Sequence, residues 1–215
     1  MTKLDIAVVD YGMGNLKSVS KAIEHVAPNK MVLVTSDPEQ IHQAERVVFP
    51  GQGAMPACMR ELDARGLREA VIEAAKTKPF LGICIGLQML FEGSEEGNTD
   101  GLGLFQGNVK KFAVEEMHDA SGIKLKVPHM GWNHVYQQET PHTMWKGIAD
   151  KARFYFVHSY YVVPEDESDT VGYSQYPKRF TCAVARGNLF AVQFHPEKSA
   201  QAGLQLLNNF VNWKP

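Results

Sequence analysis

Cysteine is scarce in this sequence, and neither sign of charge is in large excess. The 215 residues include three cysteines, a count too low and too odd for the disulfide framework of a small secreted domain. Lysine and arginine total 22 against 24 for aspartate and glutamate, a formal net charge of −2. Proteins that bind nucleic acid or an acidic membrane usually carry a basic patch, so this balance argues against both partners.

Long hydrophobic runs are also missing. The longest apolar stretch, Pro79 to Phe91, is interrupted by Gln88 and is shorter than the roughly 20 residues of a membrane-spanning helix. Asp5 and Asp10 break the N-terminal apolar segment, which therefore has no signal-peptide core. We expect a cytoplasmic protein whose thiols stay reduced. A chain of this length buries enough surface for one stable domain, and we expect residues 1–215 to form it.

Several cofactor and metal motifs are absent as well. Gly12-Met13-Gly14 follows the first expected strand, but Lys17 replaces the third glycine of a dinucleotide-binding fingerprint. The sequence has neither a P-loop for phosphates nor an HExxH zinc motif. His129 and His134 have no cysteine nearby and do not form an obvious metal site. We expect no cofactor and no metal.

Apolar strands alternate with helices in the first half of the chain, which predicts parallel βαβ units in an α/β fold. Hydrophobic periodicity and turn residues give the following elements: strands at Leu4–Val9, Met31–Thr35, Arg46–Phe49 and Pro79–Ile83, helices at Leu16–Ala27 and Leu87–Phe91, a helix start at Ser36–Glu39, and a helical stretch through Lys76.

From about Gly101 the pattern becomes rich in strands, some of them antiparallel, and a helix closes the chain. The expected elements are strands at Gly107–Val114, Gly122–Lys126, Asn133–Gln137, Phe154–Val157, Val171–Tyr176, Thr181–Arg186 and Leu189–Phe194, and a helix at Gln201–Trp213. The sequence therefore predicts a central mixed, mostly parallel sheet flanked by helices, with a β-rich C-terminal half.

The most specific local feature is Gly82-Ile83-Cys84-Ile85-Gly86, a G-x-nucleophile-x-G elbow with cysteine in place of serine. A tight strand-to-helix turn of this kind needs glycine on both sides, where a side chain would clash. The turn raises Cys84 above the carboxyl edge of the sheet, where α/β proteins bind ligands. The helix N-terminus stabilises a thiolate, and the amide of Ile85 points at a developing oxyanion. Cys58 and Cys182 have no such setting and are interpreted as structural.

His195 is the strongest candidate for a base, because a strand delivers it to the same edge and Pro196-Glu197 follows. A carboxylate beside an imidazole orients the ring, as in nucleophile–His–acid triads. The order cysteine, histidine, acid differs from that of α/β-hydrolases, which argues against an esterase or lipase.

These segments resemble the class I, triad-type glutamine amidotransferases, whose flavodoxin-like fold is then expected over the whole chain. The matching segments, in the order of the family, are Pro50–Gly53, Gly82–Leu90 and Gln193–Glu197. Three more resemble the branch of this family that serves histidine biosynthesis: Asp10–Leu16, Pro128–Asn133 and Tyr155–Tyr160.

The resemblance implies roles for individual residues. Cys84 would attack the side-chain amide of glutamine, His195 would transfer protons, and Glu197 would orient His195. Gly51, Gln52 and Gly53, with the amide of Ile85, would form the oxyanion hole. Substrate would be held by Gln88, Glu96, Ser159 and Tyr160. For Glu96, a solvated acidic turn is an equally good interpretation.

The resemblance also implies a partner. In this branch, ammonia passes to a cyclase subunit with a (β/α)8 barrel, which makes imidazole glycerol phosphate and an aminoimidazole carboxamide ribotide. Residues in segments that would face such a partner are Asn15, Trp132, Tyr155 and Lys198. Trp132 as a core aromatic and Lys198 as a plain surface lysine are the alternatives.

Two other functions stay open. A different hydrolase on the same scaffold, such as the glutaminase of pyridoxal phosphate synthesis or a γ-glutamyl hydrolase, would share the triad and the elbow. A non-catalytic binding module could keep the fold without activity, although all three triad residues are present.

Overall fold

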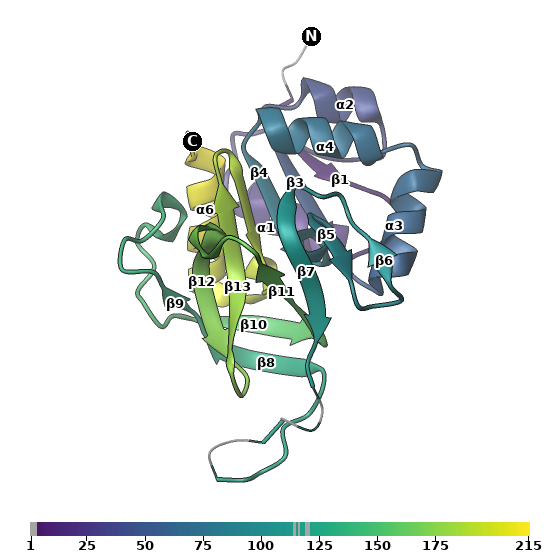
Figure 1. Cartoon of the computed structure of the whole chain (residues 1–215). Coiled ribbons are helices and arrows are strands. Elements are labelled where there is room, and N and C mark those ends of the chain that lie inside the picture. The colour runs from purple at the N-terminus through teal and green to yellow at the C-terminus, as the bar shows by residue number, and fades with distance from the viewer. Residues whose placement is uncertain (1–3, 114, 116, 119–120) are drawn as a thin grey trace.

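Parallel strands form one side of the main sheet (Figure 1). The computed structural model describes residues 4–113, 115, 117–118 and 121–215. Because parallel strands point the same way, their carboxyl ends meet at one edge of the sheet. The neighbouring strands, in order across the sheet, are β2 (Val32–Thr35), β1 (Ile6–Val9), β3 (Arg46–Gly51), β4 (Phe80–Cys84) and β14 (Leu189–Val192).

Five more strands, all from Phe91 onward in the chain, extend this sheet beyond β14 with mostly antiparallel pairing. The next strands across are β13 (Arg179–Arg186), β11 (Tyr160–Pro164), β7 (Phe105–Lys111), β5 (Phe91–Ser94) and β6 (Thr99–Asp100). Strand β12 (Thr170–Gln175) pairs with β13 and with the short β9 (Tyr136–Gln137).

Helices cover both faces of the parallel strands (Figure 1). One apolar core lies under α2 (Pro38–Gln43), α3 (Met55–Ala64) and α4 (Arg68–Thr77). The other lies under α1 (Leu16–Val26) and α6 (Ala200–Asn212). The N-caps follow the local sequence: Asn15 accepts the amide of Ser18 at 3.3 Å, and Asp37 accepts that of Glu39 at 2.9 Å.

A separate antiparallel pair, β8 (His129–His134) and β10 (Arg153–His158), crosses beneath the end of the main sheet (Figure 1). We call this pair the ribbon. Its side chains alternate, as strands dictate: His129, Phe156 and His158 are buried, whereas Met130 and Trp132 face outward. The remaining short elements are α5 (Ile85–Gln88) and the 3-10 helices η2 (Thr143–Trp145), η3 (Glu167–Asp169) and η4 (Pro196–Lys198).

The predicted α/β class and the mixed, mostly parallel sheet are confirmed. Three predicted elements are wrong. No strand forms at Gly122–Lys126, where Lys124 makes an isolated bridge to His118. The helix expected at Leu87–Phe91 is the short α5 instead, because Phe91 enters β5. The helical stretch through Lys76 is two helices, separated at Gly66 by its φ of +66°.

Strands β5, β6 and β11 were not predicted. Val114, the end of one expected strand, lies outside the described residues. No helix of the described part of the chain is both long and apolar enough to cross a membrane.

Replacing Gly86 with alanine tests how closely β3 approaches the elbow. A Cβ at this position would lie 1.9 Å from the carbonyl oxygen of Phe49, so backbone must move. We expect the substitution to lower the free energy of unfolding by about 2 kcal/mol or more, measured by chemical denaturation. Gly93→Ala is the matched control, because its new Cβ would meet the movable side chain of Asn108 at 3.1 Å and the Thr99 carbonyl oxygen at an ordinary 3.5 Å. Equal stability of both variants would contradict the expectation.

Candidate active site

Cys84 has a strained backbone at the turn from β4 into α5. Its φ of +57° and ψ of −111° lie in a region that costs a residue with a side chain about 1–3 kcal/mol. Such strain persists only where the surroundings impose it, and it is typical of functional sites. The sequence predicted this elbow from the flanking glycines and from the strand before and the helix after them.

Close contacts hold the elbow in place. Gly51 pairs with Cys84 between β3 and β4, and a Cβ on Gly51 would lie 1.8 Å from the Tyr11 hydroxyl oxygen. A Cβ on Gly82 would lie 2.9 Å from the Cβ of Ala191. Only glycine fits at these contacts. Because Gly51 pairs with Cys84, the oxyanion loop predicted at residues 51–53 begins beside Cys84.

His195 and Glu197 form a buried pair at the same edge. His195 Nδ1 lies 2.9 Å from Glu197 Oε1, and the two side chains are only 3% and 2% exposed. His195 follows β14, the parallel neighbour of β4, which brings it to Cys84. Its backbone is fixed on both sides, because its amide donates to the Tyr155 carbonyl at 2.9 Å and its carbonyl accepts the Ser199 hydroxyl at 2.6 Å.

The electrostatics of this pair favour a protonated imidazole. Burial by itself lowers the pKa of His195, but the charge interaction and hydrogen bond with Cys84, followed by the hydrogen bond and charge of Glu197, outweigh it. The pKa of His195 is therefore raised from 6.5 to about 10. His195 Nε2 and Glu197 Oε2 have no hydrogen-bond partner among the described residues, so Nε2 is available to a reacting molecule.

The other two cysteines are buried thiols. Burial raises the pKa of Cys58 to about 11 and raises that of Cys182 well above its ordinary value. A high thiol pKa disfavours the reactive thiolate, which fits the structural role predicted for both.

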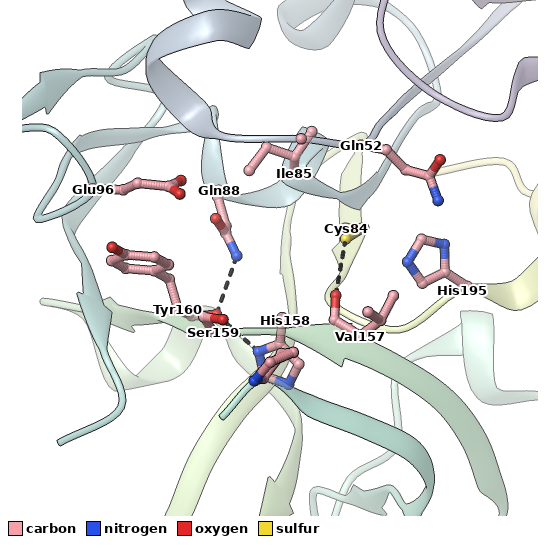
Figure 2. Close-up of a pocket in the computed structure, with 12 residues that line it drawn as sticks. Gln52, Cys84, Ile85, Gln88, Glu96, Val157, His158, Ser159, Tyr160 and His195 are labelled. Carbon is pink, nitrogen blue, oxygen red and sulfur yellow. Dashed lines mark hydrogen bonds between the residues drawn. The ribbon is translucent and has the colours of Figure 1, made fainter. Parts of the chain in front are cut away.

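A cavity of about 330 Å³ opens over Cys84. Figure 2 shows Cys84 and His195 at one end of it and Glu96, Gln88 and Tyr160 at the other. The lining residues are Gln52, Gly53, Cys84, Ile85, Gln88, Glu96, Pro128, Val157, His158, Ser159, Tyr160 and His195. All four predicted substrate residues therefore lie around one cavity. Among the described residues, no group of histidine, cysteine and acidic side chains could hold a metal ion.

Glu96 is placed by the start of α3. Its Oε2 accepts the amide of Met55 at 2.8 Å, and its own amide donates to the Ser94 hydroxyl at 3.0 Å. The carboxylate is half-buried in the cavity wall, which favours the site interpretation of Glu96 over a solvated turn.

Of the predicted oxyanion residues, Gln52, Gly53 and Ile85 line the cavity, whereas Gly51 is buried beneath it. The Gln52 carbonyl accepts a hydrogen bond from the Cys58 thiol at 3.6 Å, so this oxygen is turned away from the cavity. Ile85 is the first residue of α5, and amides at this position have no partner within their helix.

The sequence analysis missed Gln193, which is fully buried. Its Nε2 lies 3.8 Å from Cys84 Sγ, and its Oε1 accepts a hydrogen bond from Gln88 Nε2 at 3.0 Å. Its position two residues before His195 on the same strand end could have indicated it. Pro128, Val157 and His158 were missed too, because the pairing of the ribbon brings them to the cavity. The Val157 carbonyl lies 4.0 Å from Cys84 Sγ (Figure 2).

Two of the four predicted partner-facing residues, Trp132 and Tyr155, lie on the ribbon, and Lys198 lies beside them at the end of η4. Trp132 pairs with Tyr155 across β8 and β10, with ring centroids 6.3 Å apart, and Lys198 Nζ lies 6.0 Å from the Tyr155 ring. Trp132 is 44% exposed, so it is not a core residue. Asn15 lies at the exposed start of α1.

This arrangement defines a class of enzyme: a hydrolase with a cysteine nucleophile, a histidine proton donor and a glutamate that orients it. The family model of the class-I glutamine amidotransferases matches residues 7–213. The chain belongs to this family.

Close relatives cover nearly the whole chain. A protein of Dechloromonas aromatica named imidazole glycerol phosphate synthase subunit HisH is 68% identical over 98% of this chain and 97% of its own length. A protein of the same name from Nitrosospira multiformis is 66% identical over 98% and 99%. Among solved structures, a glutamine amidotransferase from Thermotoga maritima matches 94% of this chain and 80% of its own with a TM-score of 0.61. The two sequences are 16% identical, so this likeness shows a shared fold.

Removal of the Cys84 sulfur should change the titration of His195. Because its pKa is raised from 6.5 to about 10, the imidazole stays protonated at pH values between these two, where an ordinary histidine would be neutral. We expect Cys84→Ala to lower this pKa, because the interaction of His195 with the sulfur is gone, and Glu197→Gln to lower it as well. Ring ¹⁵N shifts followed by NMR from pH 5 to 11 measure both effects.

Cys182→Ala is the control and should leave the His195 titration unchanged. If His195 titrates near pH 6.5 in the unaltered protein, the charge pairing derived from the geometry is wrong.

Proposed function

We propose that this chain is the glutaminase subunit of an imidazole glycerol phosphate synthase, formed by residues 1–215 as a single domain. The observation that carries this proposal is the buried Cys84–His195–Glu197 set beside a cavity that ends in a carboxylate. The names of full-length relatives at 66–68% identity supply the particular pathway. The same names favour it over the glutaminase of pyridoxal phosphate synthesis, a γ-glutamyl hydrolase or a non-catalytic module.

Glutamine fits the cavity in one direction. Its ammonium group would meet Glu96 at the far end, with Gln88, Ser159 and Tyr160 around its amino-acid end. Its side-chain amide would then lie over Cys84 (Figure 2). Polar groups that converge on both ends of a small substrate fix its orientation.

The first half-reaction cleaves the amide. Cys84 Sγ attacks the amide carbon, and the oxyanion that forms is stabilised by the amide of Ile85 and by the loop at residues 51–53. A donor of this kind contributes about 3 kcal/mol. His195, protonated at Nε2, donates that proton to the leaving nitrogen, and ammonia departs from a cysteinyl thioester.

The second half-reaction restores the enzyme. His195 Nε2 accepts a proton from water, whose oxygen attacks the thioester carbon, and glutamate leaves as Cys84 regains its sulfur charge. Glu197 keeps the imidazole in one orientation through both steps. The net reaction converts glutamine and water into glutamate and ammonia.

The partner in this proposal is a cyclase subunit with a (β/α)8 barrel, bound as a heterodimer in the cytoplasm, which consumes the ammonia. Trp132 and Tyr155 would contact it from the ribbon, Lys198 from η4 and Asn15 from the start of α1. The outward face of the ribbon includes Val157, which also lines the cavity. A partner bound there would cover the cavity mouth.

The nucleophile assignment is tested by Cys84→Ala. We expect glutamate release from glutamine to fall by about 10³-fold or more, because no other thiol lines the cavity in the described residues. Measurement in the presence of the cyclase subunit excludes a merely low basal rate. Cys182→Ala, which removes a thiol of the core, should retain activity. Equal activity of the two variants would refute the role of Cys84.

The partner surface is tested by Trp132→Ala. Exposed aromatic residues at the centre of an interface commonly contribute about 2 kcal/mol or more to binding, so affinity for the cyclase subunit should fall by about thirtyfold. Calorimetric titration measures it. Met31→Ala is the matched control, since Met31 is 45% exposed against 44% for Trp132 but lies beside β2. An unchanged affinity of Trp132→Ala would place the partner on another face.

A further inference from the structure

Two buried histidines that the triad does not use join the ribbon to the cavity. His129 begins β8 and His158 ends β10, and they are only 3% and 6% exposed. His129 Nδ1 and His158 Nε2 lie 2.9 Å apart. His129 stacks on Tyr176 and Phe156, with centroids 3.9 and 4.9 Å away.

Asn133 fixes where the protons lie. Its Oδ1 accepts the amide of His134 at 2.8 Å and its Nδ2 donates to the Gln175 carbonyl at 2.9 Å, which sets the orientation of the amide. The same Nδ2 lies 3.2 Å from His129 Nε2. Because an amide nitrogen only donates, His129 Nε2 is the acceptor.

The tautomers of both rings follow from this. His129 carries its proton on Nδ1 and donates it to His158 Nε2. His158 then carries its proton on Nδ1 and donates it to the Tyr160 carbonyl at 2.8 Å. A second proton on His129 would place an N–H against the Asn133 amide N–H, and a second proton on His158 would place an N–H against that of His129 Nδ1. Burial agrees with this, since it lowers the pKa of His129 to about 4, and burial followed by the charge of His129 lowers that of His158 to about 3.

The far end of this chain of hydrogen bonds reaches the nucleophile. The Tyr160 carbonyl also accepts Gln88 Nε2 at 3.1 Å (Figure 2). Gln88 Nε2 donates in addition to Gln193 Oε1 at 3.0 Å, and Gln193 Nε2 lies 3.8 Å from Cys84 Sγ. The two histidines thus act on Gln88 through the Tyr160 carbonyl, and His158 also lines the cavity itself.

The other end of this chain of hydrogen bonds, His129, lies on β8, the strand that carries exposed apolar side chains. Met130 and Trp132, 62% and 44% exposed, alternate with His129 and Asn133 along β8. Any shift of β8 when a partner binds Met130 and Trp132 also moves His129.

We propose that His129 and His158 are positioning residues, a neutral pair of fixed tautomers that holds the Tyr160 carbonyl and Gln88 in place for glutamine and transmits docking on β8 to that site. This inference rests on the proposed glutaminase function. The pair neither touches the reacting atoms nor exchanges protons during turnover.

His129→Phe is the decisive variant, because it keeps the stack on Tyr176 and Phe156 and removes the bond to His158. In the complex with the cyclase subunit we expect KM for glutamine to rise about fivefold, the effect of one hydrogen bond, while kcat changes less. The stimulation of glutaminase activity by the cyclase subunit should fall as well. His142→Phe is the control, since His142 also packs on aromatic rings, Phe190 and Trp213, away from the cavity.

A second pair of variants separates positioning from packing. His158→Asn keeps a donor near the position of Nδ1 for the Tyr160 carbonyl, whereas His158→Leu does not. We expect His158→Asn to bind glutamine more tightly than His158→Leu, and equal KM values would overturn the proposal.

Proton positions give a test that needs no variant to fold. Ring ¹⁵N NMR of the unaltered protein at pH 7 should show both histidines neutral and protonated on Nδ1. A charged ring, or a proton on Nε2 of either one, would refute the proposal. Unaltered KM and stimulation in His129→Phe would also refute it, while wild-type glutaminase activity would leave the proposed function standing. Absence of that activity in the wild type would instead remove the proposed function.

Discussion

The site depends on the left-handed backbone of Cys84. A φ of +57° at a residue with a side chain is unfavourable, and the fold compensates for it by bringing β3 against the elbow. The approach is close enough that a methyl group on Gly86 would overlap the Phe49 carbonyl and one on Gly51 would overlap Tyr11. The same approach places residues 51–53 beside the sulfur. One constraint thus fixes the nucleophile, the start of α5 and the loop that faces them.

The parallel sheet and the ribbon together place Cys84 and His195. The parallel strands bring Cys84 and His195 to one edge of the sheet. The backbone of β10 contacts both residues: the Tyr155 carbonyl accepts the His195 amide, and the Val157 carbonyl faces the Cys84 sulfur. Tyr155 also pairs with the exposed Trp132. A force applied to the outer face of the ribbon therefore acts on backbone atoms that lie against Cys84 and His195.

The sequence predicted those parts of the site that carry a local signal. The elbow follows from two glycines around Cys84, and the His195–Glu197 pair from a proline that separates them. The helices α1, α2 and α6 follow from periodicity and caps. The helix predicted at Leu87–Phe91 was wrong because an apolar run fits a buried strand as well as a helix. Pairing with β7 decides in favour of a strand from Phe91 onward.

The remaining wall of the cavity has no local signal. Val157 and His158 lie more than 70 residues from Cys84, and their place depends on how β10 pairs with β8, with a register that puts His158 opposite His129. A shift of β8 by one residue against β10 would turn His129 to the surface and Trp132 inward. The stacking of the buried His129 on Phe156 and Tyr176 disfavours that shift, because those ring contacts would be lost. The aromatic core of the ribbon thus selects the register that aligns the two histidines with the Tyr160 carbonyl.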